Sequence, residues 1–387
     1  MNGAVLTLNA GSSSLKFCVF DGAAEVVRGQ VSGIGTKPKA EATQHGQALD
    51  PPRLLGATHE AVLPGLLDWV GGHLDGGSIG AVGHRVVHGG MRFAAPVRVR
   101  VTDEVTAALE ALVPLAPLHQ PHNLAAMRAA ASALPGLPQV ACFDTAFHAT
   151  MPDVATWLGL PRALHDAGVR RYGFHGLSYE FIAGRMRALD PALAAGRVLV
   201  AHLGSGASLC AMQDGRSVGT TMGLTALDGL LMATRPGSLD PGAVLHLMQG
   251  RGMSVQDVED MLYHGSGLLG ISGISRDIRA LAGSTDGRAR EAIEVFVHRI
   301  IGCAGGLIAQ MGGVDGVVFT AGIGEHDATV RGAVCRGLCW LGLVLDDAAN
   351  ARGGTARIST AGNRVAAWVV PTDEEAVIAR HTLAVVG

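Results

Sequence analysis

Two segments far apart in the chain repeat one pattern, and this repetition most restricts how the sequence can fold. The first segment has apolar runs at 5–8 and 15–20 around a turn of glycine and serine. The second has apolar runs at 198–203 and 209–212 around a similar turn. An apolar run, a turn of small residues and a second apolar run are typical of a β-hairpin. Because a repeated unit indicates duplication, the sequence predicts two related domains.

The rest of the chain alternates between expected strands and helices. Buried strands are predicted at 138–143, 316–320 and 365–370, where apolar residues predominate. The segment 288–311 places its apolar side chains at helical spacing and is the clearest helix. Strands that alternate with helices indicate an α/β fold. The segment 34–58 is rich in glycine, proline, threonine and glutamine, and we expect it to be an irregular insertion.

Composition excludes several classes of function. Of the 387 residues, 48% are hydrophobic, which is too high for a disordered chain and sufficient for a large core. The formal net charge is −3, so the chain lacks the basic excess that a nucleic-acid partner requires. No run approaches about 18 uninterrupted apolar residues, and no basic segment precedes the first apolar run, so neither a membrane partner nor a signal peptide is expected. None of the six cysteines forms a C-x-x-C pair, which favours reduced thiols in the cytoplasm.

Three glycine-rich clusters have the composition of a phosphate site. The segment 9–16 offers backbone N–H groups, three serine hydroxyls and Lys16, one of only three lysines in the chain. Close backbone approach and a compact cation are what a phosphate cradle needs. The second cluster is 202–208, and the third, 319–325, follows a strand and begins a helix, where glycines can admit a flat base. Each cluster alone could be an ordinary turn, but three in one chain favour a nucleotide site.

Five polar residues lie among apolar or small neighbours in the sequence, where polar side chains are not expected. They are Arg85 between two histidines, His119 between prolines, Asp144 at the end of a strand, His175 between glycines and Arg235 in a sharp turn. Any one of them could be structural, since a loop histidine is usually a satisfied hydrogen-bonding residue and an aspartate after a strand often caps a helix. Their order along the chain is more informative than any single one.

Taken in order, the motifs of this chain resemble those of the acetate kinases, which belong to the acetate and sugar kinase/Hsp70/actin superfamily. The resemblance covers essentially the whole chain, and any one motif alone would be weak. The motifs are Leu-Asn-Ala-Gly-Ser-Ser-Ser-Leu-Lys from Leu8, Gly-His-Arg-Val-Val-His-Gly-Gly from Gly83, Phe-Asp-Thr-Ala-Phe-His from Phe143, Tyr-Gly-Phe-His-Gly from Tyr172, His-Leu-Gly from His202, Phe-Thr-Ala-Gly-Ile-Gly-Glu from Phe319 and Asp-Glu-Glu from Asp373.

The resemblance implies an α/β fold with two duplicated ribonuclease-H-like domains, of the actin-like ATPase type, around a central cleft. The first domain would comprise 1–144 plus 375–387, and the second, 145–374, would carry most of the nucleotide site. The activity it implies is that of an acetate kinase, which transfers the γ-phosphoryl group of ATP to acetate, reversibly and with Mg²⁺ or Mn²⁺. The products would be acetyl phosphate and ADP. The resemblance also implies a cytoplasmic homodimer whose partners are these small molecules.

Matching the family motifs residue by residue implies a role for each position. Asn9 and Glu374 would lie near the metal ion, and Arg85 would bind the carboxylate. The candidate catalytic residues are His119, Asp144, His175 and Arg235. The methyl group of acetate would contact Val87, Leu118, Phe174 and Ala226. The nucleotide and its phosphates would be bound by Ser12, Ser14, Lys16, His202, Leu203, Gly204, Ser205, Gly206, Asp277, Ile278, Arg279, Gly322, Ile323, Gly324, Glu325 and His326.

The chemistry of the reaction agrees with these implied roles. A carboxylate acceptor has a pKa near ~4 and is ionised at pH 7, so the reaction requires no strong general base. The obstacle is repulsion, since two unit charges 4 Å apart repel by about 4 kcal/mol at an effective dielectric constant of about 20. Two arginines, one or two histidines, Mg²⁺ and backbone dipoles can offset this repulsion. Asp144 is then expected to orient water or metal, or to fix an arginine, rather than to remove a proton.

Several positions depart from the family pattern. Ser205 replaces an asparagine, Ala233 a glycine, Pro236 a serine or cysteine, and His326 an asparagine, so that the rate and the nucleotide preference stay open. Ala226 replaces a proline of the acyl pocket, which leaves propionate as an alternative substrate. Two further alternatives are a non-catalytic, nucleotide-driven clamp and a hydrolase. The clamp would lack the convergent arginines and histidines, and the hydrolase would release phosphate from ATP without any carboxylate.

Overall fold

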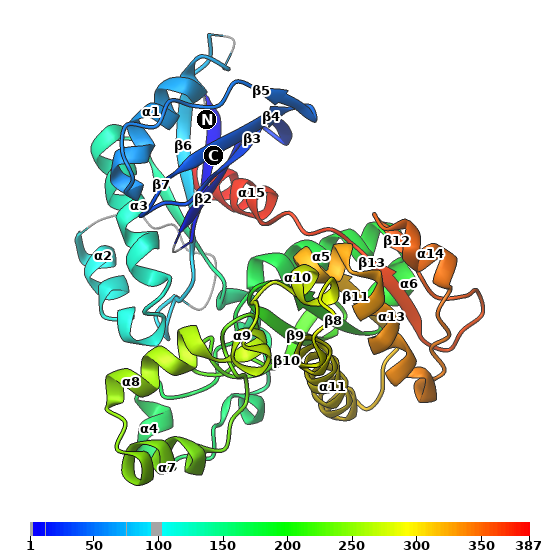
Figure 1. Ribbon diagram of the computed structural model, residues 1–387. Helices are drawn as coiled ribbons and strands as arrows, with labels where there is room; N and C mark the ends of the chain where they lie inside the picture. The colour runs from blue at the N-terminus through cyan, green and yellow to red at the C-terminus, as the bar shows by residue number, and fades with distance from the viewer. Residues whose placement is uncertain (1–2, 12, 75, 94–102) are drawn as a thin grey trace. The chain divides into compact units, whose positions relative to one another are not determined.

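The chain forms two compact units in the computed structural model (Figure 1). Unit 1 consists of Met1–Phe147 together with Asp373–Gly387, and unit 2 is His148–Thr372. Each unit contains one β-sheet with helices packed on it. The residues that the structure describes are 3–11, 13–74, 76–93 and 103–387.

Unit 1 is discontinuous, because its last helix lies far along the sequence from the rest of the unit. This helix, α15 (Glu374–Val386), begins after Asp373, whose side chain accepts a hydrogen bond from the backbone N–H of Ala376 and so caps the helix. The expected domain boundaries lie after residues 144 and 374, whereas the units divide after residues 147 and 372. The difference matters for Glu374, which lies in unit 1, whereas the expected boundary placed it in the second domain.

The sheet of unit 1 has the strand order β5-β4-β3-β2-β1-β6-β7. The strands from β5 to β1 are antiparallel to their neighbours, and β6 and β7 run parallel to β1. The strands are β1 (Ala4–Ala10), β2 (Ser14–Asp21), β3 (Ala24–Ser32), β4 (Lys39–Gln44), β5 (Gln47–Leu49), β6 (Ile79–Val86) and β7 (Gln139–Phe143). Besides α15, the α-helices are α1 (His59–Gly71), α2 (Asp103–Glu110) and α3 (Gln120–Ala133).

Different helices cover the two faces of β1 (Figure 1). Leu6 and Leu8 pack in a cluster with apolar side chains of α1 and α3. Val5 packs instead with Ala379 of α15. Because successive side chains of a strand point to opposite faces, Asn9 lies on the same face as Val5. The alternation of β1 therefore turns Asn9 toward α15.

α15 approaches β6 so closely that position 83 requires glycine. A Cβ atom at Gly83 would lie 2.3 Å from Oγ1 of Thr382 and 2.6 Å from Cγ2 of Ile378. A larger residue would push α15 away from the sheet, and the first turn of the helix would move with it.

The segment 34–58 is not an irregular insertion, and this prediction was wrong. It contains the antiparallel strands β4 and β5, joined by His45 and Gly46, both of which have positive φ angles. Two such residues are typical of a two-residue hairpin turn. The hairpin was not predicted because it lies at the edge of the sheet. Polar side chains of edge strands face solvent, so the sequence of the hairpin contains no apolar run.

The sheet of unit 2 has the strand order β10-β9-β8-β11-β13-β12. Its strands are β8 (Arg197–Leu203), β9 (Ala207–Gln213), β10 (Arg216–Thr220), β11 (Gly316–Thr320), β12 (Ala356–Arg357) and β13 (Ala366–Val369). Its α-helices are α4 (Arg162–Asp166), α5 (Gly176–Leu189), α6 (Pro191–Ala194), α7 (Pro241–Arg251), α8 (Val255–Asp260), α9 (Gly267–Ser272), α10 (Ile278–Ala282), α11 (Gly287–Gln310), α12 (Ala321–His326), α13 (Ala328–Gly337) and α14 (Asp347–Arg352).

The two sheets share one topology, which confirms the predicted duplication. In unit 1 the antiparallel strands β3, β2 and β1 are followed by the parallel strands β6 and β7. In unit 2 the antiparallel strands β10, β9 and β8 are followed by the parallel strands β11 and β13. Both predicted hairpins are present, as β1–β2 and β8–β9.

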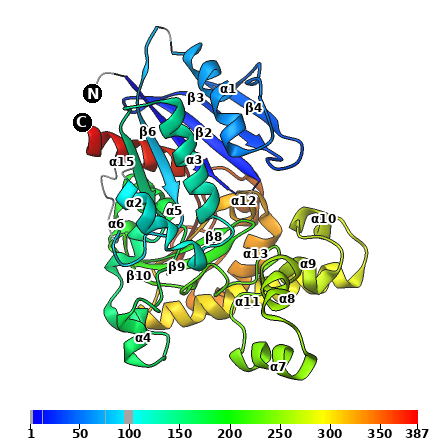
Figure 2. The same ribbon diagram turned by 90° about the vertical axis from the view of Figure 1, so that its left-hand side faces the viewer.

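Helix α11 is the long helix predicted from apolar spacing, and Figure 2 shows it along one side of unit 2. The side chain of Asp286 caps its first turn. Its length and mean hydropathy meet the criterion for a membrane span, and it is the one helix of the described chain that does so. This is weak evidence for a membrane span, since a core helix of a soluble protein meets the same criterion. Its buried side chains fall on one face and are Ala289, Ala292, Phe296, Ile300, Ala304, Leu307 and Ile308.

Candidate active site

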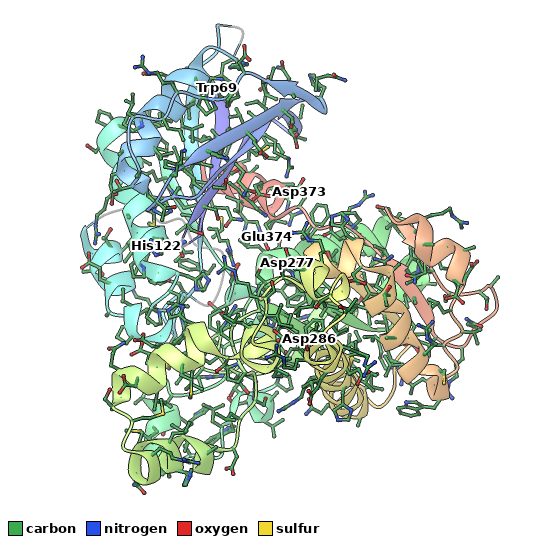
Figure 3. The ribbon with its side chains drawn as sticks, viewed as in Figure 1. Trp69, His122, Asp277, Asp286, Asp373 and Glu374 are labelled. Carbon is green, nitrogen blue, oxygen red and sulfur yellow. The ribbon has the colours of Figure 1, made fainter. Side chains whose placement is uncertain are left out.

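Asn9 connects the end of β1 to the first turn of α15. Its Nδ2 donates to Oε2 of Glu374 and to Oε1 of Glu375, each over 3.0 Å. Its Oδ1 accepts from Nη1 of Arg85 over 3.2 Å. Figure 3 labels Glu374 next to Asp373, where the chain enters α15. One buried amide therefore joins two carboxylates to an arginine.

Arg85 and Asp144 form a buried ion pair at the carboxyl ends of β6 and β7. The two strands are parallel neighbours, so their ends meet at one edge of the sheet. Nε of Arg85 lies 3.1 Å from Oδ2 of Asp144, and Nη2 lies 2.5 Å from the same oxygen. Asp144 is fully buried, and the Arg85 side chain is 15% exposed. Burial alone would lower the pKa of Arg85, but the charges of Asp144 and Glu374 outweigh burial and raise it. The guanidinium is thus held as a cation.

Two residues that sequence reasoning missed complete this network. Glu375 is buried, and its burial, with the adjacent Glu374 carboxylate, raises its pKa. Arg28 on β3 supplies a partner: Nη1 lies 3.5 Å from Oε2 of Glu375, and Nη2 lies 2.6 Å from Oδ2 of Asp373. The Asp-Glu-Glu motif was a signal for the carboxylates. Nothing in the sequence around Arg28 indicated that this arginine pairs with the carboxylates.

The donor set at this edge of unit 1 suits Mg²⁺. Glu374 supplies a carboxylate, a hard ligand that Mg²⁺ prefers, and Oδ1 of Asn9 has a second lone pair besides the one that accepts from Arg85. Proteins usually hold Mg²⁺ through one or two carboxylates plus phosphate oxygens of the substrate. Within the described ranges there is no group of three histidine, cysteine, aspartate or glutamate residues that could hold a metal ion. Glu374 is the carboxylate that the family motif assigns to the metal, and its Oε2 lies 3.8 Å from Nε of Arg85.

The first turn of α3 is tied to the residues that follow β6. Asn123 Oδ1 accepts from the backbone N–H of Val87 over 3.0 Å, and Asn123 Nδ2 donates to the carbonyl of Ala10 over 2.7 Å. Leu118 and His119 directly precede this helix and are half-buried. Sequence reasoning missed Asn123, which lies with the apolar Leu124 and Met127 on the buried side of α3.

The first predicted phosphate turn, between β1 and β2, is only partly described. Ser12 lies outside the described residues. Ser14 begins β2 and is half-buried, and Lys16 is paired with Asn9 across the β1–β2 hairpin. The Lys16 side chain is exposed, and its charge acts on Glu375 in the direction that lowers the pKa of that carboxyl.

In unit 2, the second predicted phosphate turn joins β8 and β9 and lies against His175. Leu203 ends β8 in the core, Gly204 and Gly206 are half-buried, and Ser205 is exposed. His175 precedes α5 in a left-handed backbone conformation, with φ of 59°. Its ring stacks on that of His202, with centroids 4.0 Å apart and planes 12° apart.

Arg235 points into unit 2 and lies against the second phosphate turn. A Cβ atom at Gly206 would lie 2.7 Å from Nη2 of Arg235 and 3.3 Å from Nε2 of His175. Nη1 of Arg235 donates to the carbonyl of Ala226 over 2.7 Å. Burial lowers the pKa of Arg235 to about 10, so the guanidinium is charged at neutral pH. Pro236 is therefore compatible with an inward arginine.

The two residues of unit 2 that were predicted to line the acyl pocket, Phe174 and Ala226, differ in burial. Phe174, just before His175, is 2% exposed, and its carbonyl is bonded to Nε2 of His148 over 2.9 Å. Ala226 is half-buried, and its carbonyl is the one that holds Arg235. A change of backbone at position 226 can therefore alter the position of Arg235.

The third glycine cluster follows β11 and forms α12, as the sequence predicted. Oε1 of Glu325 accepts from the backbone N–H of Ala321 over 2.8 Å and from that of Thr372 over 3.1 Å. A Cβ atom at Gly204 would lie 3.7 Å from that of Ala321, so this cluster and the second phosphate turn are neighbours. Of the remaining predicted residues here, Gly324 is buried, Ile323 half-buried, and Gly322 and His326 exposed.

The predicted segment 277–279 begins α10. Asp277 caps the helix through the backbone N–H of Arg279 and also binds its guanidinium, with Nη2 2.7 Å from Oδ2. Ile278 is buried, and Figure 3 labels Asp277. The side-chain hydrogen bonds described for Asp277 and Arg279 join them to each other and to Ser275, so the role of the segment in nucleotide binding stays a prediction.

Arg331, which was not predicted from the sequence, stabilises α12 through hydrogen bonds to its backbone carbonyls. It is 1% exposed, and its guanidinium donates to the carbonyls of Gly324 and Glu325 over 3.0 and 2.9 Å. It also donates to the carbonyl of Asn350 over 2.6 Å. These carbonyls would lose their donors without it.

Arg331→Met is expected to lower the free energy of unfolding by about 3 kcal/mol, because buried carbonyls left without donors are costly. Urea denaturation followed by circular dichroism measures the change. The control is Arg336→Met on the same helix, whose side chain is 62% exposed. Equal losses of stability in the two variants would contradict the assignment.

A protein-family model described as the acetokinase family matches residues 4–380. The chain belongs to the acetokinase family. The acetate kinase of Rhodopseudomonas palustris (strain ATCC BAA-98 / CGA009) is 50% identical over 391 residues, with 98% of both chains covered. A propionate kinase from Francisella tularensis has a similar structure, with a TM-score of 0.90, 36% identity and 99% of both chains covered. The acetate kinase of Porphyromonas gingivalis matches with a TM-score of 0.85, 36% identity and full coverage of both chains.

Family membership confirms the fold and the class of reaction. The chain has the actin-like ATPase fold of these kinases, with the two related α/β sheets described above. It is a phosphotransferase with a carboxyl group as acceptor, and ATP is the phosphoryl donor of the family. The roles of single residues in this chain stay predictions.

Proposed function

We propose that this chain transfers the γ-phosphoryl group of ATP to acetate, reversibly and in line, giving acetyl phosphate and ADP. The observation that carries the proposal is the position of Arg235, whose buried guanidinium lies against the α-carbon of Gly206 beside His175. A buried cation at a phosphate turn suits the transition state of phosphoryl transfer, in which negative charge spreads over the equatorial oxygens.

In unit 1, Arg85 binds the acetate carboxylate. The hydrogen bonds described for Arg85 use three of its five N–H groups, which are Nε–H, one on Nη1 and one on Nη2. Among the described residues, this leaves one N–H on each Nη atom, a pair that matches the two oxygens of a carboxylate. Asp144 and Asn9 fix the orientation of that pair. His119, which precedes α3 of unit 1, is proposed to help stabilise the transferring phosphoryl group.

In unit 2, His175 and Arg235 stabilise the transferring phosphoryl group. The turn after β8 binds the phosphates of the nucleotide through His202 and the backbone of residues 203–206. The start of α12 at 322–326 and the segment 277–279 bind the base and ribose.

Glu374 and Asn9 hold Mg²⁺ in this proposal. The metal supplies charge neutralisation at the phosphate oxygens when it is bound. Removal of the metal with a chelator is expected to stop the transfer, and Mn²⁺ is expected to restore part of it.

We also propose that the protein is a homodimer in the cytoplasm. All six cysteines are free thiols, which suits a reducing compartment. Helix α11 is apolar, and most of its apolar window is not buried within the chain, so a second copy can cover the exposed part.

Propionate is the second candidate substrate. One similar structure is that of a protein named a propionate kinase. Ala226 is smaller than the proline that is common at this position of the family, which makes the acyl pocket roomier.

A hydroxylamine trap with ATP, Mg²⁺ and acetate, propionate or butyrate tests the proposal. Hydroxylamine converts an acyl phosphate into a coloured hydroxamate, so colour is expected with acetate and, at lower kcat/KM, with propionate. A steep preference for acetate over propionate would contradict the roomier pocket. Release of phosphate from ATP without any carboxylate, and no hydroxamate, would indicate a hydrolase and overturn the proposal.

A further inference from the structure

We infer that Tyr179 and Ser208 form a hydrogen-bond relay that fixes the tautomer of His175, with the proton on Nε2. This nitrogen then donates to the substrate anion while Nδ1 accepts from the relay. The inference rests on the proposed function only for the identity of the anion, since the relay itself lies within unit 2.

The relay is buried and its distances are short. Oγ of Ser208, on β9, lies 2.8 Å from Nδ1 of His175 and 2.5 Å from the phenolic oxygen of Tyr179 on α5. Tyr179 and Ser208 are both fully buried. A serine hydroxyl has one proton, so between these two neighbours it donates to one and accepts from the other.

The chemistry of the three groups sets the direction of the relay. Burial raises the pKa of Tyr179 well above its ordinary value, so the phenol keeps its proton. A phenol is a stronger donor than an aliphatic hydroxyl, and an unprotonated imidazole nitrogen is a stronger acceptor than a phenolic oxygen. The favoured arrangement is therefore Tyr179 donating to Ser208 and Ser208 donating to Nδ1. A neutral His175 must then carry its proton on Nε2.

Nε2 of His175 points to the place where the anion is expected. It lies 3.3 Å from the position that a Cβ atom at Gly206 would occupy, and Arg235 lies on the same side of that turn. A bare Nε2 would present a lone pair to a phosphate oxygen and repel it. A protonated Nε2 makes His175 a donor without a positive charge.

Several titratable or charged groups face His175. The ring of His202 stacks on it from β8, and the guanidinium of Arg235 lies near its Nε2. Behind it, Tyr179 lies on α5, and His148 bonds to the carbonyl of Phe174. A second positive charge on His175 would be close to Arg235, so a neutral donor suits the site better than an imidazolium.

Histidine-labelled protein tests the tautomer directly. Long-range ¹H–¹⁵N NMR distinguishes a protonated ring nitrogen from a bare one, and His175→Gln assigns the signals. At pH 8 we expect a protonated Nε2 and a bare Nδ1. A proton on Nδ1, or on both nitrogens, would overturn the inference. This measurement needs no variant to be active, and no activity of the wild type.

Kinetics test the relay as a positioning device. Tyr179→Phe is expected to lower kcat about fivefold, with KM for ATP and acetate within about twofold, because one hydrogen bond is lost away from the substrates. The variant should also lose activity as the pH rises above about 6.5, where an ordinary imidazolium deprotonates, whereas the wild type should not. Equal pH profiles, with an unchanged tautomer in the variant, would overturn the relay.

Two further variants separate the relay from general effects on folding. Ser208→Ala should reproduce the pH dependence of Tyr179→Phe, and Ser208→Thr, which keeps the hydroxyl, should restore the wild-type profile. The control is Tyr172→Phe, which removes a phenol bonded to the carbonyl of Gly168 over 2.9 Å and should leave the profile unchanged. If the wild type forms no hydroxamate, the proposed function fails, whereas the NMR result on the tautomer still stands.

Discussion

Replacing Arg235 by alanine is expected to lower kcat about a thousandfold, the scale found when a positive charge is removed from a transferring phosphoryl group. KM for ATP and acetate should change much less, because the charge on the equatorial oxygens grows only in the transition state. Stopped hydroxylamine assays over a range of both substrates separate the two parameters.

Two further arginine variants make this result specific. Arg235→Lys should lie between wild type and alanine, because an ammonium lacks the fork that can hold the Ala226 carbonyl and a phosphate oxygen together. Arg290→Ala on α11, whose side chain is 80% exposed, should leave kcat unchanged. A kcat for Arg235→Ala within tenfold of the wild type would show that the transfer does not depend on this charge.

Asp144→Asn is expected to have the second-largest effect, a fall in kcat/KM for acetate of about a hundredfold or more. The substitution keeps the shape of Asp144 but removes the charge that fixes Arg85, and breaking a buried ion pair costs about 3–5 kcal/mol. Part of that cost appears as lost stability, so the melting temperature should also fall. KM for acetate should rise more than KM for ATP, because Arg85 is the proposed carboxylate ligand.

The matched control is Asp315→Asn, which breaks an exposed pair of similar geometry. Nε and Nη2 of Arg197 both bind Asp315, but the Asp315 side chain is 41% exposed. Water replaces such partners at little cost, so kcat/KM should stay the same. Near-normal turnover of Asp144→Asn would refute the role of the buried pair.

Much of the fold follows from local sequence patterns. The Gly/Ser turns between apolar runs predicted both central hairpins, and apolar spacing predicted α11 within one residue at each end. These features depend on residues near one another in the chain. The β4–β5 hairpin was missed because an exposed edge strand needs no apolar pattern.

The candidate site also contains residues that were predicted from local motifs and contacts that were not. The residues that chemistry and motif order singled out include Arg85, Asp144 and Arg235, and the structure buries all three side chains or nearly so. The sequence could not predict which partners fix the side chains of the site in place. The pairing of Arg28 with Glu375, and of Ser208 with Tyr179, joins positions far apart in the chain, and only packing brings them together.

Unit 1 is built from two segments that lie far apart in the chain, and this affects how the protein folds during synthesis. During synthesis, β1 and β2 leave the ribosome long before α15, and at about 5–20 residues per second the delay is tens of seconds. Until α15 arrives, the face of the sheet that carries Val5 and Phe20 has no cover, and Asn9 has neither of its carboxylates. The nascent chain therefore presents an apolar surface to chaperones, and a message truncated before codon 373 yields a protein without α15 and without the carboxylate of the predicted metal site.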